Sequence, residues 1–243
     1  MPFKFYTDAM LHYDKKDETS FALGTTLSFE ALLRKGEKVR RVYVSPKQTR
    51  DETYQKIKAL CQNLAIPLIE NNEKIFASAD KDNVMVIAEF AKFETPLDPL
   101  KNHVVLVHPS NMGNLGTIMR SSAAFNLGGL AIIRPAADAF DPKTIRSSMG
   151  AIFSLPFSYF DRFEDYLKVA GNRHLYPFML QAKMSVRDVK KEKPYSLIFG
   201  NEATGLDQSF LTIGTPLIIP QSSSIDSLNL DNAVSIAIFS FLD

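Results

Sequence analysis

The sequence has a single cysteine, no long apolar run and almost no net charge, and each of these features argues against a class of protein. Cys61 is the only cysteine among 243 residues, which excludes an intrachain disulfide and a zinc site built on cysteines. No apolar run approaches the roughly 18 residues of a membrane span, and the first dozen residues do not resemble a signal peptide. We therefore expect a cytoplasmic protein in a reducing compartment, with no membrane partner.

The charges nearly cancel, because 28 basic residues face 27 acidic ones and leave a net charge of +1. No global basic field therefore predicts a nucleic-acid partner. One local run stands out between residues 34 and 50, where seven basic residues face the single acid Glu37: Arg34, Lys35, Lys38, Arg40, Arg41, Lys47 and Arg50. This run is either an ordinary solvated face or a surface for RNA, and charge alone leaves both open.

The length and the 45% hydrophobic content allow one large domain or two modest ones. Residues 1–20 show no strong period and predict a loosely packed lead-in. Residues 21–90 alternate between helix and strand patterns, which predicts a compact α/β unit. Its expected elements are a helix over 29–33 capped by Ser28, a strand at 39–44, a helix at 51–64, a strand at 67–69, a helix at 72–78 and a strand at 84–90. We expect an N-terminal domain over residues 1–92.

Residues 93–102 contain two prolines and no periodicity, so we interpret them as a linker to a second domain over residues 103–243. Its expected strands are 103–108, 130–133, 175–180, 195–199 and 216–220. A Gly/Asn loop over 109–120 should turn into a helix that runs through Phe125 and stops at Gly128 and Gly129. Further helices should run from Asp141 and Pro142 toward Gly150 and cover 163–169 and 230–242. Apolar runs that stop at Gly, Pro or Ser predict buried parallel strands. Their polar loops, 200–206 and 221–226, should lie side by side where open α/β sheets bind ligands.

Several familiar chemistries lack support. Gly113 and Gly116 form G-x-x-G rather than the dinucleotide-binding G-x-G-x-x-G, and Arg134 stands where a ribose-binding acid is expected. The histidines (His12, His103, His108 and His174) share no metal-ligand spacing, so we expect no metal. No serine lies in a G-x-S-x-G elbow, which leaves a hydrolase triad without support.

Three blocks remain once these chemistries are set aside. They are Asn111-x-Gly113-Asn114-x-Gly116-x-x-x-Arg120, the stretch FGNEATGL at 199–206, and Ile219-Pro220 followed by Ser227-Leu228-Asn229. In this order, with SSMGA at 147–151 between them, they resemble the three motifs of the SpoU (TrmH) branch of the SPOUT RNA methyltransferases. The resemblance covers residues 103–242. Residues 21–90 resemble, more loosely, the ribosomal-protein-like domain that often precedes it.

The resemblance implies an α/β fold whose C-terminal parallel-sheet domain carries a trefoil knot, after a smaller ribosomal-protein-like α/β domain. It also implies a homodimer and methylation of a ribose 2′-hydroxyl in rRNA or tRNA, with S-adenosyl-L-methionine as cofactor. Gly200, Ile219 and Leu228 match positions whose main chain holds that cofactor. Asn114, Arg120, Glu202 and Asn229 match the functional polar positions. We expect Arg34, Lys35, Lys38, Arg40 and Arg41 to contact substrate RNA.

The reaction suggests a role for each polar residue. An arginine with a pKa above ~12 is a poor base, so we expect Arg120 to clamp a phosphate and stabilise the forming alkoxide. Glu202 would hold Arg120 or neighbouring backbone, while Asn114 and Asn229 would orient the hydroxyl or the loops. Structural interpretations also stand: Arg120 as a surface helix residue, Glu202 as a turn residue, and Asn229 as a helix cap.

Two other functions stay open at this point, a catalytically silent RNA-binding relative and a nucleobase methyltransferase of the same fold. The last expected helix is apolar on most faces, which predicts that it packs on its mate in a homodimer.

Overall fold

The computed structural model describes residues 11–70, 72–77, 83–222 and 224–242, and the chain divides into two compact units. The first unit contains Met1–Phe93 and Phe140–Phe153, and the second contains Glu94–Ala139 and Ser154–Asp243. The segment Phe140–Phe153 thus groups with the N-terminal residues, although its place in the sequence suggested the C-terminal domain.

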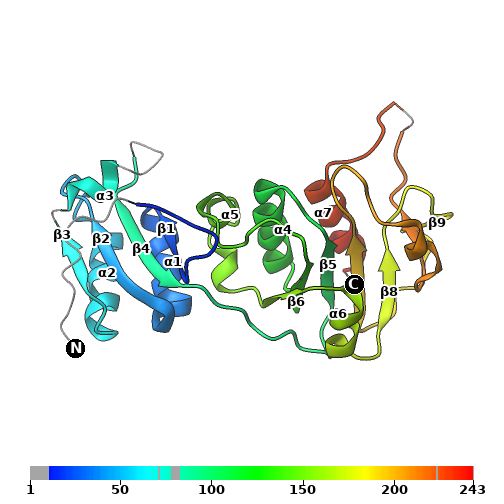
Figure 1. The fold of residues 1–243 in the computed structure, drawn as a ribbon, viewed down its shortest axis with the longest axis horizontal. Helices are drawn as coiled ribbons and strands as arrows, with labels where there is room; N and C mark the ends of the chain where they lie inside the picture. The colour runs from blue at the N-terminus through cyan, green and yellow to red at the C-terminus, as the bar shows by residue number, and fades with distance from the viewer. Residues whose placement is uncertain (1–10, 71, 78–82, 223, 243) are drawn as a thin grey trace. The chain divides into compact units, whose positions relative to one another are not determined.

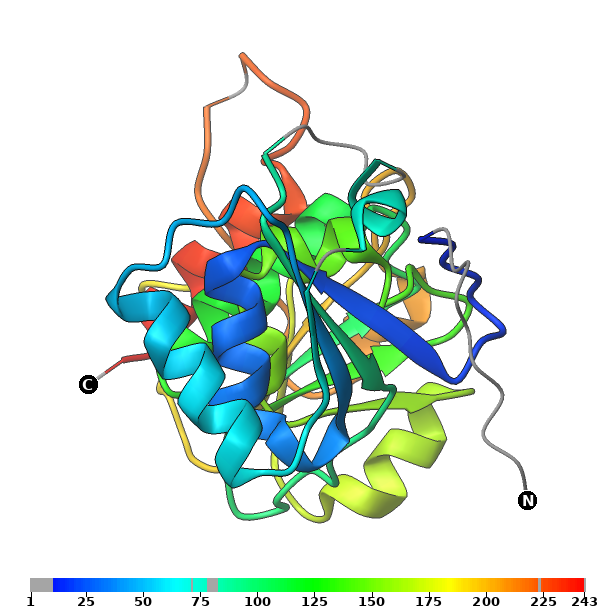
Figure 2. The ribbon, with the colours of Figure 1, turned by 90° about the vertical axis from the view of Figure 1, so that its left-hand side faces the viewer.

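The first unit is built on a four-stranded sheet with the order β1-β4-β2-β3 (Figures 1 and 2). Its strands are β1 (Thr19–Leu23), β2 (Val39–Val44), β3 (Leu68–Glu70) and β4 (Val86–Ala91). Strand β4 runs antiparallel to both β1 and β2, while β2 and β3 are parallel. Strand β1 corrects the expected lead-in, because Ser20 is fully buried in it and its hydroxyl donates to the carbonyl of Phe140.

Two helices of the first unit, α1 (Thr25–Lys35) and α2 (Glu52–Asn63), pack on each other (Figure 2). The expected start of α1 was wrong, because Ser28 lies inside the helix and its hydroxyl donates to the carbonyl of Ala22 at 3.0 Å. In α2 the side chain of Asp51 caps the amino end by accepting from the backbone N–H of Tyr54, and Cys61 is buried as predicted. A short helix, α3 (Glu73–Ala77), follows β3.

The segment Phe140–Phe153 completes the core of the first unit. Its helix α5 (Pro142–Ser147) has the predicted Asp141 cap but ends before Gly150, and the 3₁₀ turn η2 (Ala151–Phe153) follows. The rings of Phe140 and Phe153 contact those of Phe93 and Phe90, with centroids 5.4 and 5.1 Å apart respectively. Residues far apart in the chain therefore share one aromatic cluster.

The second unit holds a five-stranded sheet with the order β7-β6-β5-β10-β8, in which all paired neighbours are parallel (Figure 1). The strands are β5 (His103–Val107), β6 (Gly129–Ile133), β7 (Phe157–Phe160), β8 (His174–Pro177) and β10 (Tyr195–Phe199). All five residues of β10 are buried, as expected for a central strand covered on both faces. In the described part of the chain, no helix is both long and apolar enough to cross a membrane.

Helices cover both faces of this sheet. Tyr166 of α6 (Phe163–Ala170) reaches Ser196 of β10, whereas Phe241, just after α7 (Leu230–Ser240), contacts Tyr195. Because successive strand residues point to opposite faces, α6 and the end of α7 lie on opposite faces. Helix α4 (Met112–Ala124) packs beside α7.

Two expectations for the second unit were wrong in detail. Helix α4 begins at Met112, inside the expected loop, because the Asn111 side chain caps it by accepting from the N–H groups of Gly113 and Asn114. It also ends at Ala124, before the two glycines. The apolar run 216–220 contributes only β11 (Leu217–Ile218), which pairs with β9 (Met184–Ser185) in a separate sheet. The prolines at 216 and 220 have no N–H for a longer ladder.

A polar cluster lies near the amino ends of the central strands, formed by the buried side chains of His103, Tyr166 and Ser196 and the half-buried Arg173. Arg173 Nη1 donates to Nδ1 of His103, so the proton is on Nε2, which donates to the carbonyl of Asp98 at 2.9 Å. His103 is fully buried, and this burial, with the nearby charge of Arg173, lowers its pKa to about 4. The imidazole is therefore neutral at physiological pH.

Candidate active site at the carboxyl edge of the sheet

Strands β5 and β10 are neighbours at the point where the order in which the chain adds strands to the sheet reverses. From β5 the chain continues to β6 on one side, whereas β10 has β8 on its other side. Open α/β sheets bind ligands in the crevice beyond the carboxyl ends of such a strand pair. The segment that leaves β5, residues 108–111, leads into the first sequence block, and the segment that leaves β10, residues 200–206, lies in the second.

Glu202 joins these two segments. Its Oε2 accepts from the backbone N–H of Ser110 at 3.0 Å and from the hydroxyl of Ser110 at 2.8 Å. Its Oε1 accepts from the backbone N–H of Asn111 at 3.1 Å and from Nδ2 of Asn114 at 3.2 Å. Partial burial opposes ionisation, but these donors outweigh it and hold the pKa of Glu202 below its ordinary value. Glu202 is thus an ionised carboxylate fixed across the strand pair.

The loop after β10 has a shape that depends on Asn201 and two glycines. Asn201 Nδ2 donates to the carbonyl of His108 at 2.8 Å, and its Oδ1 accepts from the N–H of Ala203 at 2.9 Å. Gly205 adopts a left-handed conformation with φ of 68°. A Cβ on Gly200 would lie 2.1 Å from the carbonyl carbon of Gly205, so the two chain segments can approach this closely only at glycine.

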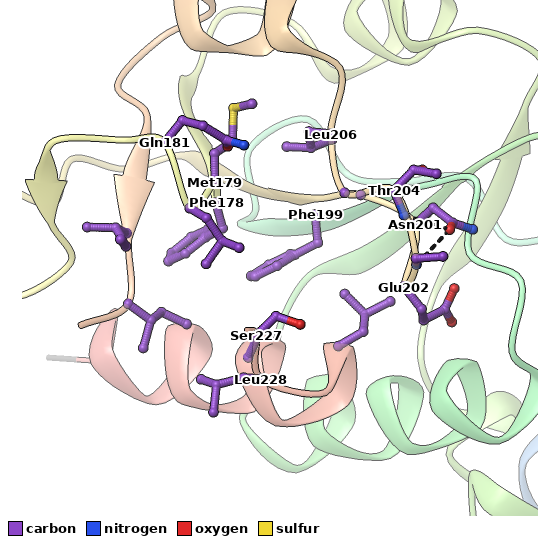
Figure 3. Close-up of a pocket in the computed structure, with 18 of the residues that line it drawn as sticks. Phe178, Met179, Gln181, Phe199, Asn201, Glu202, Thr204, Leu206, Ser227 and Leu228 are labelled. Atoms are coloured by element: carbon purple, nitrogen blue, oxygen red, sulfur yellow. Dashed lines mark hydrogen bonds between the residues drawn. The ribbon is translucent and has the colours of Figure 1, made fainter. Parts of the chain in front are cut away.

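A cavity of about 230 Å³ lies beside this loop (Figure 3). Gly200, Ile219 and Leu228, the three expected cofactor-binding residues, all line it, as does Glu202. The segments of the second and third blocks therefore meet at one cavity, as expected from the strand ends.

The cavity combines a flat apolar wall with polar groups. The rings of Phe178 and Phe199 stack with centroids 4.7 Å apart and an interplanar angle of 10°. Gln221, Ser227 and Thr204 supply polar side chains to the lining. Such a surface can accept an aromatic ring and the hydroxyl groups of one small molecule.

The Arg120 side chain is exposed on α4 and forms no hydrogen bond or ion pair with any residue that the structure describes. Two partners were expected for Glu202. It accepts hydrogen bonds from neighbouring backbone, as one expectation had it, and it forms none with Arg120. The guanidinium is left available to a ligand.

Asn229 occupies the position before α7, but within the described chain its side chain forms no capping hydrogen bond. Asn229 is therefore the N-cap residue of α7, as the structural interpretation predicted, but it caps through its carbonyl, which accepts from the N–H of Ala233 at 2.9 Å, and not through its side chain. Helices α4 and α7 run in the same direction, because Ser121 pairs with Ser235 at 2.8 Å and Phe125 contacts Phe239 one turn later. The amino ends of both helices, which carry Asn114 and Asn229, thus point to the same edge of the unit.

Sequence reasoning missed three residues that build this site: Ser110, Asn111 and Asn201. Asn111 had a usable signal, since Asn before a helical pattern is a strong N-cap. Ser110 and Asn201 had none, because their roles come from pairing across 92 and 93 residues. Among the described residues, no group of three or more His, Cys, Asp or Glu side chains could hold a metal ion.

The expected RNA-binding run of the first unit is largely paired. Arg34, Arg40 and Arg41 lie near the carboxylates of Glu30, Glu18 and Glu89, at 2.5, 3.9 and 3.2 Å respectively. The ammonium of Lys35 lies over the Phe93 ring at 5.2 Å. Only Lys38, of the five expected contacts, has no side-chain partner among the residues the structure describes. The field of this run is therefore weaker than its charge count suggests.

Comparisons with known proteins agree with this geometry. The chain is 29% identical over 196 residues to the 23S rRNA (uridine(2479)-2′-O)-methyltransferase of Streptomyces viridochromogenes, which covers 74% of this chain and 65% of that protein. It is 32% identical over 130 residues to the 23S rRNA (guanosine(2553)-2′-O)-methyltransferase RlmP of Bacillus subtilis, covering 52% of each. The matches thus span less than two thirds of these relatives' own lengths.

The fold matches a solved structure, the AdoMet-bound rRNA methyltransferase from Sinorhizobium meliloti, with a TM-score of 0.80 and 26% identity. That match covers 92% of this chain and 87% of the other. The model of the SpoU rRNA Methylase family matches residues 101–239, which include all three blocks. The chain therefore belongs to the SpoU rRNA Methylase family.

Proposed function

We propose that the protein transfers a methyl group from S-adenosyl-L-methionine to a ribose 2′-hydroxyl of rRNA or tRNA. The observation that carries this proposal is the cavity at the β5–β10 switch, where Gly200, Ile219 and Leu228 meet beside the fixed carboxylate of Glu202. The names of the relatives support the reaction, and the AdoMet-bound neighbour supports the methyl donor.

The lining of the cavity suits this donor. The stacked rings of Phe178 and Phe199 offer an apolar wall for an adenine, and Ser227 and Gln221 offer partners for ribose hydroxyls. Main-chain groups near Gly200 can approach the ligand closely because no side chain intervenes. When bound, S-adenosyl-L-methionine supplies a methyl group on a sulfonium centre, and the protein has to position the acceptor oxygen in line with it.

The polar residues take separate roles in this proposal. Arg120, which has no partner in the described chain, clamps a phosphate of the substrate and stabilises the forming alkoxide. Asn114, whose Nδ2 donates to Glu202 at 3.2 Å, orients the acceptor hydroxyl. Asn229 offers a side-chain amide that forms no capping hydrogen bond, near the same edge. Glu202 positions the first and second blocks relative to each other.

We extend the proposal to the whole chain. Residues 1–92 bind substrate RNA and residues 93–102 act as the linker. Residues 103–243, apart from the segment Phe140–Phe153 that groups with the first unit, form a methyltransferase domain whose C-terminal segment is a trefoil knot. The enzyme acts in the cytoplasm, where its RNA substrates would be. It is a homodimer through α7, whose exposed Ile236 and Phe239, 41% and 68% accessible, leave an apolar face for a second copy.

Two measurements test the reaction. Calorimetry should show binding of S-adenosyl-L-methionine and of its demethylated product. Tritiated methyl groups should then pass to total RNA from a strain that lacks this protein, and digestion should find the label on a ribose. Label on a base would reassign the enzyme to nucleobase methylation, whereas donor binding without transfer would indicate a silent RNA-binding relative. Absence of donor binding would overturn the proposal.

A further inference from the structure

A second basic segment, absent from the expected RNA contacts, lies in the second unit. Between residues 183 and 193, five basic residues face the two acids Asp188 and Glu192, whereas the whole chain has a net charge of only +1. The basic residues are Lys183, Arg187, Lys190, Lys191 and Lys193.

Two of these cations are available for a partner. The ammonium of Lys190 lies 2.7 Å from the carboxylate of Glu192, and that of Lys191 lies over the Phe241 ring at 5.8 Å. Lys183 and Arg187 are exposed, and the side chain of neither has a hydrogen bond or ion pair with a residue of the described ranges. They differ in this respect from Arg34, Arg40 and Arg41, which have glutamate partners.

The backbone that carries the two cations is held in place. Met184 pairs with Leu217 in the β9–β11 sheet, and the N–H of Val186, a buried residue, donates to the carbonyl of Ile218 at 3.0 Å. The N–H of Arg187 donates to Oγ of Ser185 at 3.1 Å. Binding here would therefore require little ordering of the chain, which is one of the main costs of association.

This segment continues directly from the wall of the cavity. Phe178 and Gln181 line the cavity, and the chain runs from them into β9 (Figure 3). Leu180, which also lines the cavity, and Met184 are 52% and 44% exposed, so exposed apolar side chains alternate with the free cations along this stretch of the chain. We call Leu180, Lys183, Met184 and Arg187 the β9 surface.

We infer that the β9 surface binds unpaired RNA nucleotides close to the one whose ribose is methylated. The cations suit phosphates, and the exposed apolar side chains suit the faces of unstacked bases. A duplex would present phosphates and 2′-hydroxyls and would leave the apolar groups without partners. This inference rests on the proposed function, because it assigns part of the substrate to a surface beside the donor cavity.

The test compares two double variants with the same loss of charge. Lys183→Gln with Arg187→Gln removes the free cations of the β9 surface. Lys168→Gln with Lys190→Gln is the matched control, because these exposed lysines already lie 2.8 and 2.7 Å from the carboxylates of Asp165 and Glu192. The probe is a fluorescent single-stranded RNA of about twelve nucleotides and random sequence, titrated between 50 and 300 mM salt.

The first double variant should bind this RNA roughly tenfold more weakly, with a log–log salt slope smaller by about 1.4, since each single-strand phosphate contact contributes about 0.7. The control should keep the wild-type slope. Met184→Ser should weaken single-strand binding without changing the slope, and its affinity for a duplex of equal length should not change. Equal slopes for both double variants, or equal effects on duplex and single strand, would overturn the inference.

Two further readouts separate this inference from the proposed function. If the wild type methylates RNA and the first variant keeps both its Michaelis constant for RNA and its salt slope, the inference fails while the function stands. If the wild type transfers no methyl group but the first double variant has a smaller salt slope for RNA binding, the β9 surface still binds RNA and the proposed function fails. Altered sedimentation of the first variant with unchanged RNA affinity would identify the surface as a protein contact and also overturn the inference.

Discussion

Lowering the pH from 7 to 5 should remove about 2 kcal/mol of folding stability through one side chain, His103. Its pKa in the folded protein is about 4, against an ordinary value of 6.5. At pH 7 both folded and unfolded forms leave it mostly neutral, whereas at pH 5 only the unfolded form takes up the proton. The contribution of neutral His103 to the free energy of unfolding is therefore fully present above pH 6.5 and is lost as the pH falls toward 4. The full difference is about 3 kcal/mol, of which about 2 kcal/mol falls between pH 7 and pH 5.

The surroundings of His103 explain the direction. Burial and the charge of the Arg173 guanidinium lower the pKa of His103, and they outweigh Asp98, whose carbonyl and charge act in the opposite direction. A second proton would have to sit on Nδ1, which already accepts from Arg173. His103→Gln can keep both an acceptor and a donor at the site, so it removes the titration while leaving a comparable polar group.

Urea unfolding followed by circular dichroism at pH 7 and pH 5 measures the effect, since the chain has no tryptophan for fluorescence. The variant will be less stable than the wild type at pH 7, but its loss on going to pH 5 should be smaller by about 2 kcal/mol. Every other side chain is the same in the two proteins, so its contribution cancels in the comparison. An equal loss in the two proteins would refute the assignment of a depressed pKa to His103.

Four further predictions concern the site and the dimer. Arg120→Ala should lower methyl transfer by roughly 10²–10³-fold and leave donor affinity within a few-fold, because Arg120 is not in the cavity lining; parallel loss of both would reassign it to donor binding or folding. Gly200→Ala should abolish donor binding in calorimetry and lower the Tm, since its Cβ meets backbone; retained affinity would mean that the loop relaxes. Glu202→Gln places an amide group against N–H donors and should cost roughly 1–3 kcal/mol in thermal or urea unfolding; unchanged stability and activity would deny it a positioning role. Ile236→Glu should give a monomer of about half the wild-type mass in sedimentation, whereas Ile238→Glu, at a fully buried position, should unfold the subunit; a dimeric Ile236→Glu would exclude α7 as the interface.

The parts of the fold that sequence could predict are those with a local physical cause. Strand β10 was predictable because the mainly apolar run Tyr195–Phe199 stops at Gly200, and all five of its residues are buried in the structure. Helix α5 was predictable because Asp141 caps it and Pro142 fits its first turn. The meeting of Gly200 and Ile219 at one cavity was also predicted, but the reasoning from a shared sheet edge was incomplete, because Ile219 follows β11, which pairs with β9 in a separate sheet.

The remaining features depend on partners distant in the sequence. Glu202 looks like a turn residue until Ser110, 92 positions earlier, is brought to its carboxylate. The charge of Arg41 looks available until β2 pairs with β4 and places Glu89 at 3.2 Å. Strand β1 has only five residues, too few for a clear period, and is stabilised largely by its ladder with β4.

The contribution of Phe140–Phe153 to the first unit has a consequence for synthesis on the ribosome. Domains generally fold from the amino terminus as they emerge, but this unit lacks α5, Phe140 and Phe153 until residue 153 has left the exit tunnel. By then β5, α4 and β6 of the second unit have already emerged. A nascent chain that ends near residue 93 would present Phe90 and Phe93 without the rings of Phe140 and Phe153, so we expect it to be a poor autonomous fragment and a target for chaperones.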